Sequence, residues 1–299
     1  MPTVVTIFAL AAALLYGTAD FLGGVASRRA SMFAVLAMTV PAGAVVVVVV
    51  ALLGETPGVG GLLGHGAGSP TSFGGWGAVG WAAASGVCGA VGLIAFYAGF
   101  AAAPISVVAP VAALVSTVLP VGVAMAGGER PTGSMIAGGL VCLVAIVLVS
   151  MPSDGTGLGS AAAGRLRALG YGAAAGAGFG LFFLCLKNAG QSGVLWPVAI
   201  SRTAGTLVAF GIALATRTRP WRVGRTSAVA LASGAVDAAA NVCYVLATRV
   251  GLFGLAVVIA SLYPGTTVLL ARWVLGERMR WLQRAGLLLA AAGVVLLTV

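Results

Sequence analysis

Charged residues are scarce in this sequence. Asp, Glu, Lys and Arg together make up 7% of the 299 residues, whereas hydrophobic residues make up 60% and the mean hydropathy is +1.11. A soluble domain carries about 25% charged residues, and a disordered chain combines much charge with few apolar residues. The composition therefore excludes both classes and predicts a polytopic membrane protein with little mass outside the bilayer.

Histidine and paired cysteines are also scarce. His65, the one histidine, lies in a glycine-rich gap, and the four cysteines lie within apolar runs and form no C-x-x-C pair. We therefore expect no metal, no disulfide framework and no cofactor. The H-E-x-x-H, G-x-S-x-G and P-loop patterns are absent as well. We expect neither an enzyme nor an ATP-driven pump, so an ion gradient or the solute's own gradient would have to drive transport.

Ten apolar runs have the length of about 20 residues that crosses a bilayer. These runs are 3–25, 32–53, 76–99, 104–126, 133–150, 168–187, 195–215, 227–247, 252–274 and 281–299. A gap at 152–167 lies at the midpoint of the chain and is rich in small and turn-forming residues. We expect a first five-helix repeat at 1–151, a linker at 152–167 and a second five-helix repeat at 168–299.

The two halves resemble each other in sequence. A shift of 148 residues places Ser85-Gly86 on Ser233-Gly234 and Gly128-Glu129-Arg130 on Gly276-Glu277-Arg278. Each half has five spans, and an odd number turns the second half upside down relative to the first. The predicted fold is an all-α polytopic membrane protein in which ten transmembrane helices form two inverted five-helix repeats, the construction of many secondary transporters.

These features resemble the EamA-type members of the drug/metabolite transporter superfamily. The resemblance rests on the segments 112–116, 128–130 and 137–138 and on their counterparts 260–264, 276–278 and 285–286. It implies one central cavity lined mainly by the first, third, fourth, sixth, eighth and ninth spans. It does not imply a substrate, because similar proteins export amino acids, metabolites, nucleotides and drugs.

We therefore expect a secondary transporter, exporting a small metabolite or drug-like solute by alternating access, either coupled to H⁺ or Na⁺ or facilitative. The alternatives are a flippase for a lipid-linked headgroup and a non-transporting scaffold or channel. The expected partners are a small-molecule substrate and the lipid bilayer, and the chain is expected to be a monomer or homodimer. The net charge of +10 is spread as single arginines between apolar runs, without interleaved aromatic residues, so no nucleic acid is expected.

Charge inside a span is costly and indicates function. Asp20 is expected about five residues from the end of its span, where it either reaches the interface or binds a proton or substrate amine. Arg202 and Asp237 come to nearly equal depth on neighbouring spans, so we expect an ion pair between them. The alternative is that Arg202 reaches the interface and Asp237 is protonated. Asn241 shares the helical face of Asp237 and extends a polar stripe.

Aromatic and proline residues add further candidates. Tyr16, Tyr97, Tyr244 and Tyr263 are expected to line the cavity or to lie at the bilayer interface, and Tyr263 is too deep for the interface. Kinks or hinges are expected at prolines inside spans, namely Pro41, Pro110, Pro120 and Pro264.

Three further features are expected to be structural. Glu129 and Glu277 are expected to form ion pairs with the adjacent Arg130 and Arg278 that fix the turns. Lys187 is expected to be an interface charge at the end of the sixth span. The G-x-x-x-G steps at Gly172, Gly176 and Gly180 are expected to let another helix approach closely.

Basic residues predict the orientation. With the termini in the cytoplasm, the cytoplasmic gaps would hold three basic residues, and the opposite gaps and their flanks would hold twelve. Positive loops stay inside, so we expect a cytoplasmic-membrane protein with arginine-rich loops in the cytoplasm and both termini outside. The resemblance implies the opposite orientation.

Overall fold

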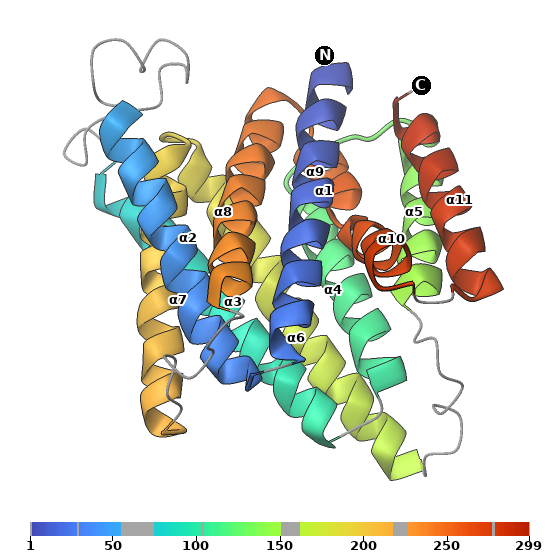
Figure 1. Ribbon diagram of the computed structural model, residues 1–299. Helices are drawn as coiled ribbons and strands as arrows, with labels where there is room; N and C mark the ends of the chain where they lie inside the picture. Colours follow the sequence, from blue (N-terminus) through green and yellow to red (C-terminus); the bar gives the residue numbers. More distant parts are fainter. Residues whose placement is uncertain are drawn as a thin grey trace.

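The fold consists of α-helices throughout the described residues. A computed structural model describes residues 2–28, 30–54, 75–102, 105–150, 162–217, 227–276 and 279–298 (Figure 1). Its helices are α1 (Pro2–Ser27), α2 (Met32–Gly54), α3 (Gly75–Ala102), α4 (Ile105–Ala126), α5 (Gly133–Ser150), α6 (Ala162–Gly190), α7 (Leu195–Ala215), α8 (Ser227–Val250), α9 (Phe253–Ala260), α10 (Tyr263–Leu275) and α11 (Trp281–Thr298).

The ten predicted membrane spans are confirmed. Ten helical segments of the described chain are long and apolar enough to cross a bilayer, and α9 and α10 together make one of them. Large apolar side chains also face outward, as lipid contact requires: Leu207 is 70% exposed and Leu288 is 74% exposed. The protein is therefore a multi-pass membrane protein.

The ninth span is interrupted rather than kinked. Helix α9 ends at Ala260, and α10 starts again at Tyr263 with Pro264 in its first turn. Pro264 has no N–H to donate to the preceding turn, so this position favours a new helix start over helix continuation. Pro41, Pro110 and Pro120 instead lie inside the unbroken helices α2 and α4.

Helix α6 begins inside the predicted linker 152–167. Residues 162–167 belong to α6, because the segment contains alanine, leucine and arginine, which favour helix. Residues 152–161 of the predicted linker lie outside the described part of the chain.

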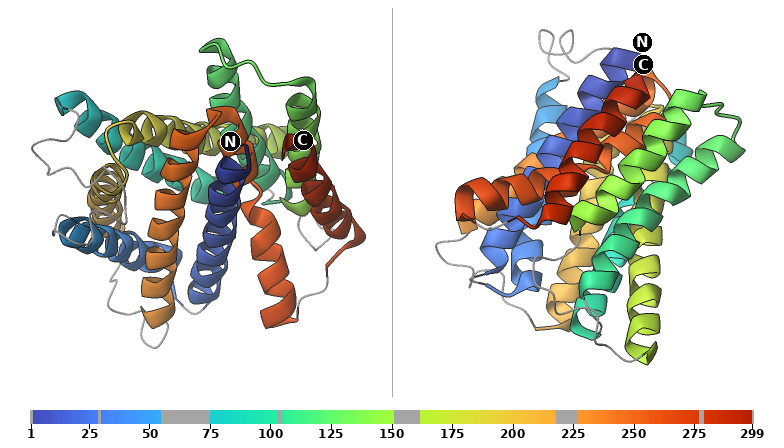
Figure 2. Two further views of the ribbon diagram at one scale, coloured as in Figure 1. Left: turned by 90° about the horizontal axis from the view of Figure 1, so that it is seen from above. Right: turned by 90° about the vertical axis from the view of Figure 1, so that its right-hand side faces the viewer.

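Packing between the halves holds the molecule together. Helix α1 packs along α8, α3 along α6, α2 along α7, and α5 along α11. The start of α1 and the end of α11 lie on one side of the molecule (Figures 1 and 2). The G-x-x-x-G prediction is confirmed, because a Cβ on Gly172 or Gly176 would meet Val111 or Val115 of α4 at 2.8 Å or 2.6 Å.

Candidate transport cavity

A cavity of about 680 Å³ lies between the two halves. Its wall is formed by α1, α2, α3, α4, α6, α7, α8 and α10, with edge contributions from α11 and from the end of α5. The family resemblance implied that six of the spans line the cavity. The structure confirms these six and adds α2 and α7 to the lining. A volume of this size is typical of sites for small molecules.

The cavity reaches one face of the membrane domain. Its lining includes Ser27 and Ser150, the last residues of α1 and α5, and Gln283 near the start of α11. All three helix ends lie on the side of the arginine-rich gaps. The cavity is therefore accessible from that side.

Aromatic side chains close the inner end of the cavity. The rings of Tyr16 and Phe183 meet edge to face with centroids 6.0 Å apart, and Tyr244 packs on Phe183 at 4.7 Å. Tyr244 is fully buried and donates a hydrogen bond to the carbonyl oxygen of Phe183 at 3.0 Å. Beyond this layer, every residue of α9 except Gly254 is buried. The described chain therefore shows no passage to the opposite face.

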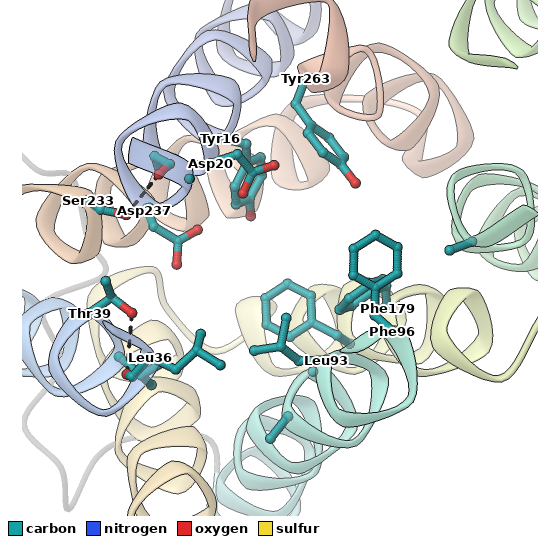
Figure 3. A pocket seen from close by; sticks show the side chains of 18 of the residues that line it. Tyr16, Asp20, Leu36, Thr39, Leu93, Phe96, Phe179, Ser233, Asp237 and Tyr263 are labelled. Atoms are coloured by element: carbon teal, nitrogen blue, oxygen red, sulfur yellow. Dashed lines mark hydrogen bonds between the residues drawn. The ribbon is translucent and has the colours of Figure 1, made fainter. Parts of the chain in front are cut away.

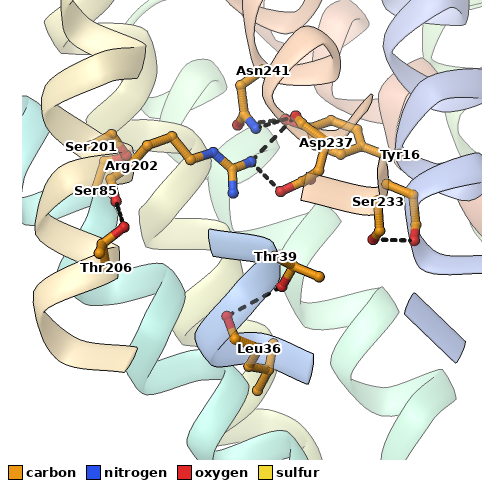
Figure 4. A network of polar contacts seen from close by, with 11 residues as sticks. Tyr16, Leu36, Thr39, Ser85, Ser201, Arg202, Thr206, Ser233, Asp237 and Asn241 are labelled. Atoms are coloured by element: carbon orange, nitrogen blue, oxygen red, sulfur yellow. Dashed lines mark hydrogen bonds and ion pairs between the residues drawn. The ribbon is translucent and has the colours of Figure 1, made fainter. Parts of the chain in front are cut away.

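The predicted ion pair between Arg202 and Asp237 is confirmed. The guanidinium Nη2 of Arg202 contacts the carboxylate Oδ2 of Asp237 and also donates a hydrogen bond to its carbonyl oxygen at 3.3 Å (Figure 4). The two side chains are 12% and 30% exposed and both residues line the cavity. Their charges compensate each other within the membrane domain, where an isolated charge would be costly.

A buried hydrogen-bond chain extends from this pair. Asn241 Nδ2 donates to the carbonyl oxygen of Asp237 at 2.6 Å, and the Tyr16 hydroxyl donates to Asn241 Oδ1 at 2.9 Å. The chain links α7, α8 and α1 (Figure 4). Asn241 is 1% exposed and does not line the cavity, so it supports Asp237 from behind.

Asp20 faces the cavity, and no described residue compensates its charge. It is exposed, and it has no hydrogen bond or ion pair within the described part of the chain. Asp20 lies seven residues before the end of α1 at Ser27, roughly 10 Å along the helix axis, which is deeper than expected. Figure 3 shows Asp20, Asp237, Tyr16 and Tyr263 on one side of the cavity.

The opposite wall is apolar and aromatic. Phe96 of α3 and Phe179 of α6 meet with ring centroids 5.9 Å apart, and Leu93 lies beside them (Figure 3). Phe182 also lines the cavity. The sequence analysis did not select these phenylalanines, although three of the eleven lie together at 179, 182 and 183.

The remaining predicted site residues lie in different places. Tyr263 and Pro264 line the cavity, whereas Tyr244 is buried beneath it and does not line it. Pro110 and Pro120 lie on α4 and do not line the cavity either. Tyr97 belongs to α3, but its side chain lies outside the described part of the structure.

The family model of the EamA-like transporter family matches residues 166–299. The match covers the second half of the chain, which is therefore similar in sequence to EamA-like transporters. A crystal structure of a protein with 19% sequence identity covers 98% of this chain and 94% of that chain, with a TM-score of 0.75. The shared fold therefore includes the first half, which the EamA match does not reach. No curated protein sequence matches the chain.

Glu129 has a different partner from the one expected. Its carboxylate oxygens accept hydrogen bonds from the backbone amides of Phe253 and Gly254 at 2.8 Å and 3.0 Å, at the start of α9. The expected ion pair with Arg130 is not found, although both residues are described. A carboxylate at a helix N-terminus satisfies free N–H groups and the positive end of the helix dipole. Lys187 adds a contact here, with its Nζ 5.3 Å from the ring centroid of Phe253.

Proposed function

We propose that this multi-pass membrane protein belongs to the drug/metabolite transporter superfamily and is a secondary transporter that moves a small metabolite or drug-like solute by alternating access. The observation that carries the proposal is the one-sided cavity between the two halves. It reaches the arginine-rich face and ends at the layer formed by Tyr16 and Phe183. A solute site open to one face and closed to the other is one of the two states that alternating access requires.

The pattern of helix packing supports a rocking motion of the halves. The packing is reciprocal: the first helix of each half packs on the third helix of the other half, as α1 on α8 and α6 on α3. Inverted repeats would produce this reciprocity, and exchanging the conformations of two such halves would open the opposite face. In this scheme, the hydrogen bonds between Glu129 and the start of α9 hold the two halves together at the closed face.

Charged cavity residues supply the coupling candidates. Asp20 is positioned to bind a proton or a cationic group, and the pair of Arg202 and Asp237 is positioned for a solute group that competes for one of its charges. We propose export as the direction, with H⁺ or Na⁺ coupling or facilitated movement as the two energetic possibilities.

The alternatives fit the cavity less well. A scaffold needs neither an open cavity nor an uncompensated Asp20, and a channel needs a continuous polar path, which the aromatic layer interrupts. A flippase would share the fold and differ in its substrate, so transport assays must include a lipid-linked headgroup.

Accessibility of two engineered cysteines tests alternating access. The four native cysteines are first replaced by alanine; then Ser27→Cys reports the open face and Val121→Cys, beside Gly254, reports the sealed face. Proteoliposomes are exposed to pooled metabolites and to an impermeant thiol reagent. A transported solute should change the two labelling rates in opposite directions. Simultaneous labelling of both sites would indicate a channel, and permanent protection of Val121→Cys would indicate a scaffold.

A further inference from the structure

The described lining of the cavity carries an uncompensated negative charge, in contrast to the strongly positive chain. Among the residues that the structure describes, the charged ones in its lining are Asp20, Arg202 and Asp237. Arg202 and Asp237 form an ion pair, which leaves Asp20 as the remaining charge when it is ionised. The cavity therefore favours a ligand with one positive charge over a neutral or anionic ligand of the same size.

The position of Asp20 indicates a ligand rather than a structural role. The residue is exposed to the cavity, and within the described chain its carboxylate has no hydrogen-bond donor. An unpaired carboxylate within the membrane is costly, so a proton or another cation must accompany it. The carboxylate of Asp237, by contrast, is already engaged by Arg202.

The aromatic wall defines the rest of the ligand. Phe96, Phe179 and Phe182 line the cavity opposite Asp20, and the Tyr263 ring lies beside the acidic side (Figure 3). The faces of aromatic rings attract cations, and their apolar surface packs against hydrocarbon groups. The cavity thus combines one anionic point with an extensive apolar surface.

We propose that the cavity binds monovalent organic cations, with the ammonium group at Asp20 and the apolar body against Phe96, Phe179 and Phe182. This inference rests on the proposed transport function and specifies its substrate class. Recognition depends on charge and ring contacts, so a quaternary ammonium, which has no N–H to donate, binds as well.

A set of three matched probes tests this inference on the full chain in detergent at mildly alkaline pH. Isothermal titration compares benzyltrimethylammonium with neopentylbenzene, its neutral carbon analogue, and with the anion phenylmethanesulfonate. We expect the cation to bind at least about tenfold more tightly than the other two. Asp20→Asn should weaken cation binding about 30-fold, the lower end of the cost of removing one partner of a buried charge pair.

Two further variants separate the contributions. Phe179→Leu should weaken cation binding about fivefold through loss of the ring face. Glu55→Gln removes the same charge as Asp20→Asn and follows the apolar run 32–53 in the sequence, so it should leave the affinity unchanged. The inference would be overturned if the unmodified protein bound the neutral or anionic probe as tightly as the cation, or if it bound no cation at millimolar concentration. Neither measurement depends on whether Asp20→Asn folds.

The cysteine reporters distinguish this failure from failure of the transport function. If a neutral or anionic solute switches the labelling of Ser27→Cys and Val121→Cys while the cation does not bind, the transport proposal is supported and the cation-site proposal is wrong. If the cation binds through Asp20 but no solute ever exposes Val121→Cys, the site stands and the transport proposal is wrong.

Discussion

The carboxylate of Glu129 is bound to the backbone amide of Phe253 at 2.8 Å, which joins the end of α4 to the start of α9. The two residues are 124 positions apart and belong to different halves. This contact lies at the face that the cavity does not reach. A link between the halves at that place opposes their separation and stabilises the closed face.

Removing the Glu129 carboxylate should open the sealed face more often. The loss of a helix cap costs about 1 to 2 kcal/mol, so Glu129→Ala should shift the equilibrium between closed and open about 5- to 30-fold. The labelling rate of Val121→Cys measures this shift directly. Arg130→Ala is the matched control, because Arg130 is exposed and adjoins Glu129. An unchanged labelling rate in Glu129→Ala would show that the contact does not hold the face closed.

The pair of Arg202 and Asp237 should behave as one unit. Breaking a fully buried ion pair costs about 3 to 5 kcal/mol. Because this pair is partly exposed to the cavity, Arg202→Leu and Asp237→Leu alone should each lower folded yield and thermal stability by less than that. The double variant removes both charges and should recover folded yield. Size-exclusion yield and a thermal unfolding curve measure the stability of each protein.

Transport by the double Arg202→Leu, Asp237→Leu variant is a separate measurement. If the pair takes part in transport, the variant should be well folded and inactive. A folded variant with normal transport would assign the pair a purely structural role.

Much of the architecture could be predicted from the sequence, for definite physical reasons. A bilayer demands about 20 apolar residues per span, so the ten spans were visible without a structure. Charge inside the membrane must be compensated, so helix length alone placed Arg202 and Asp237 at matching depth. Asp20 was recognised by the same argument, although the structure places it further from the end of its helix.

Which face of each helix points to the cavity could not be predicted. Lipid-facing and protein-facing sides of these helices are both apolar, so no hydrophobic periodicity distinguishes them. Tyr244 was therefore expected in the cavity or at the interface and is buried in the core, and Phe96 and Phe179 were not selected. The partner of Glu129 could not be predicted either, because it depends on how the halves pack.

Two glycines of the repeated Ser-Gly dipeptide should be intolerant of alanine. A Cβ on Gly86 would collide with the carbonyl oxygen of Ser201, and a Cβ on Gly234 would collide with that of Thr39. Forcing extra atoms into a packed interface costs about 1 to 3 kcal/mol, so each alanine variant should lower the thermal unfolding midpoint. Gly80→Ala and Gly122→Ala are matched controls, because a Cβ there meets nothing within 4 Å. Equal midpoints in all four variants would contradict the close packing of α3 on α7 and of α8 on α2.

The orientation predicted from the arginines determines which face the cavity opens to. If the arginine-rich side is cytoplasmic, the cavity opens to the cytoplasm, ready to collect a solute for export. Trp76, at the start of α3 on the opposite side, is 91% exposed, and Arg217 follows α7 on the arginine-rich side. In intact cells that carry the cysteine-free protein, an impermeant thiol reagent should label Trp76→Cys, whereas Arg217→Cys should react only after the cells are permeabilised. The reverse pattern would place both termini in the cytoplasm and the opening of the cavity on the outside. The conformation described here would then release an exported solute rather than collect it.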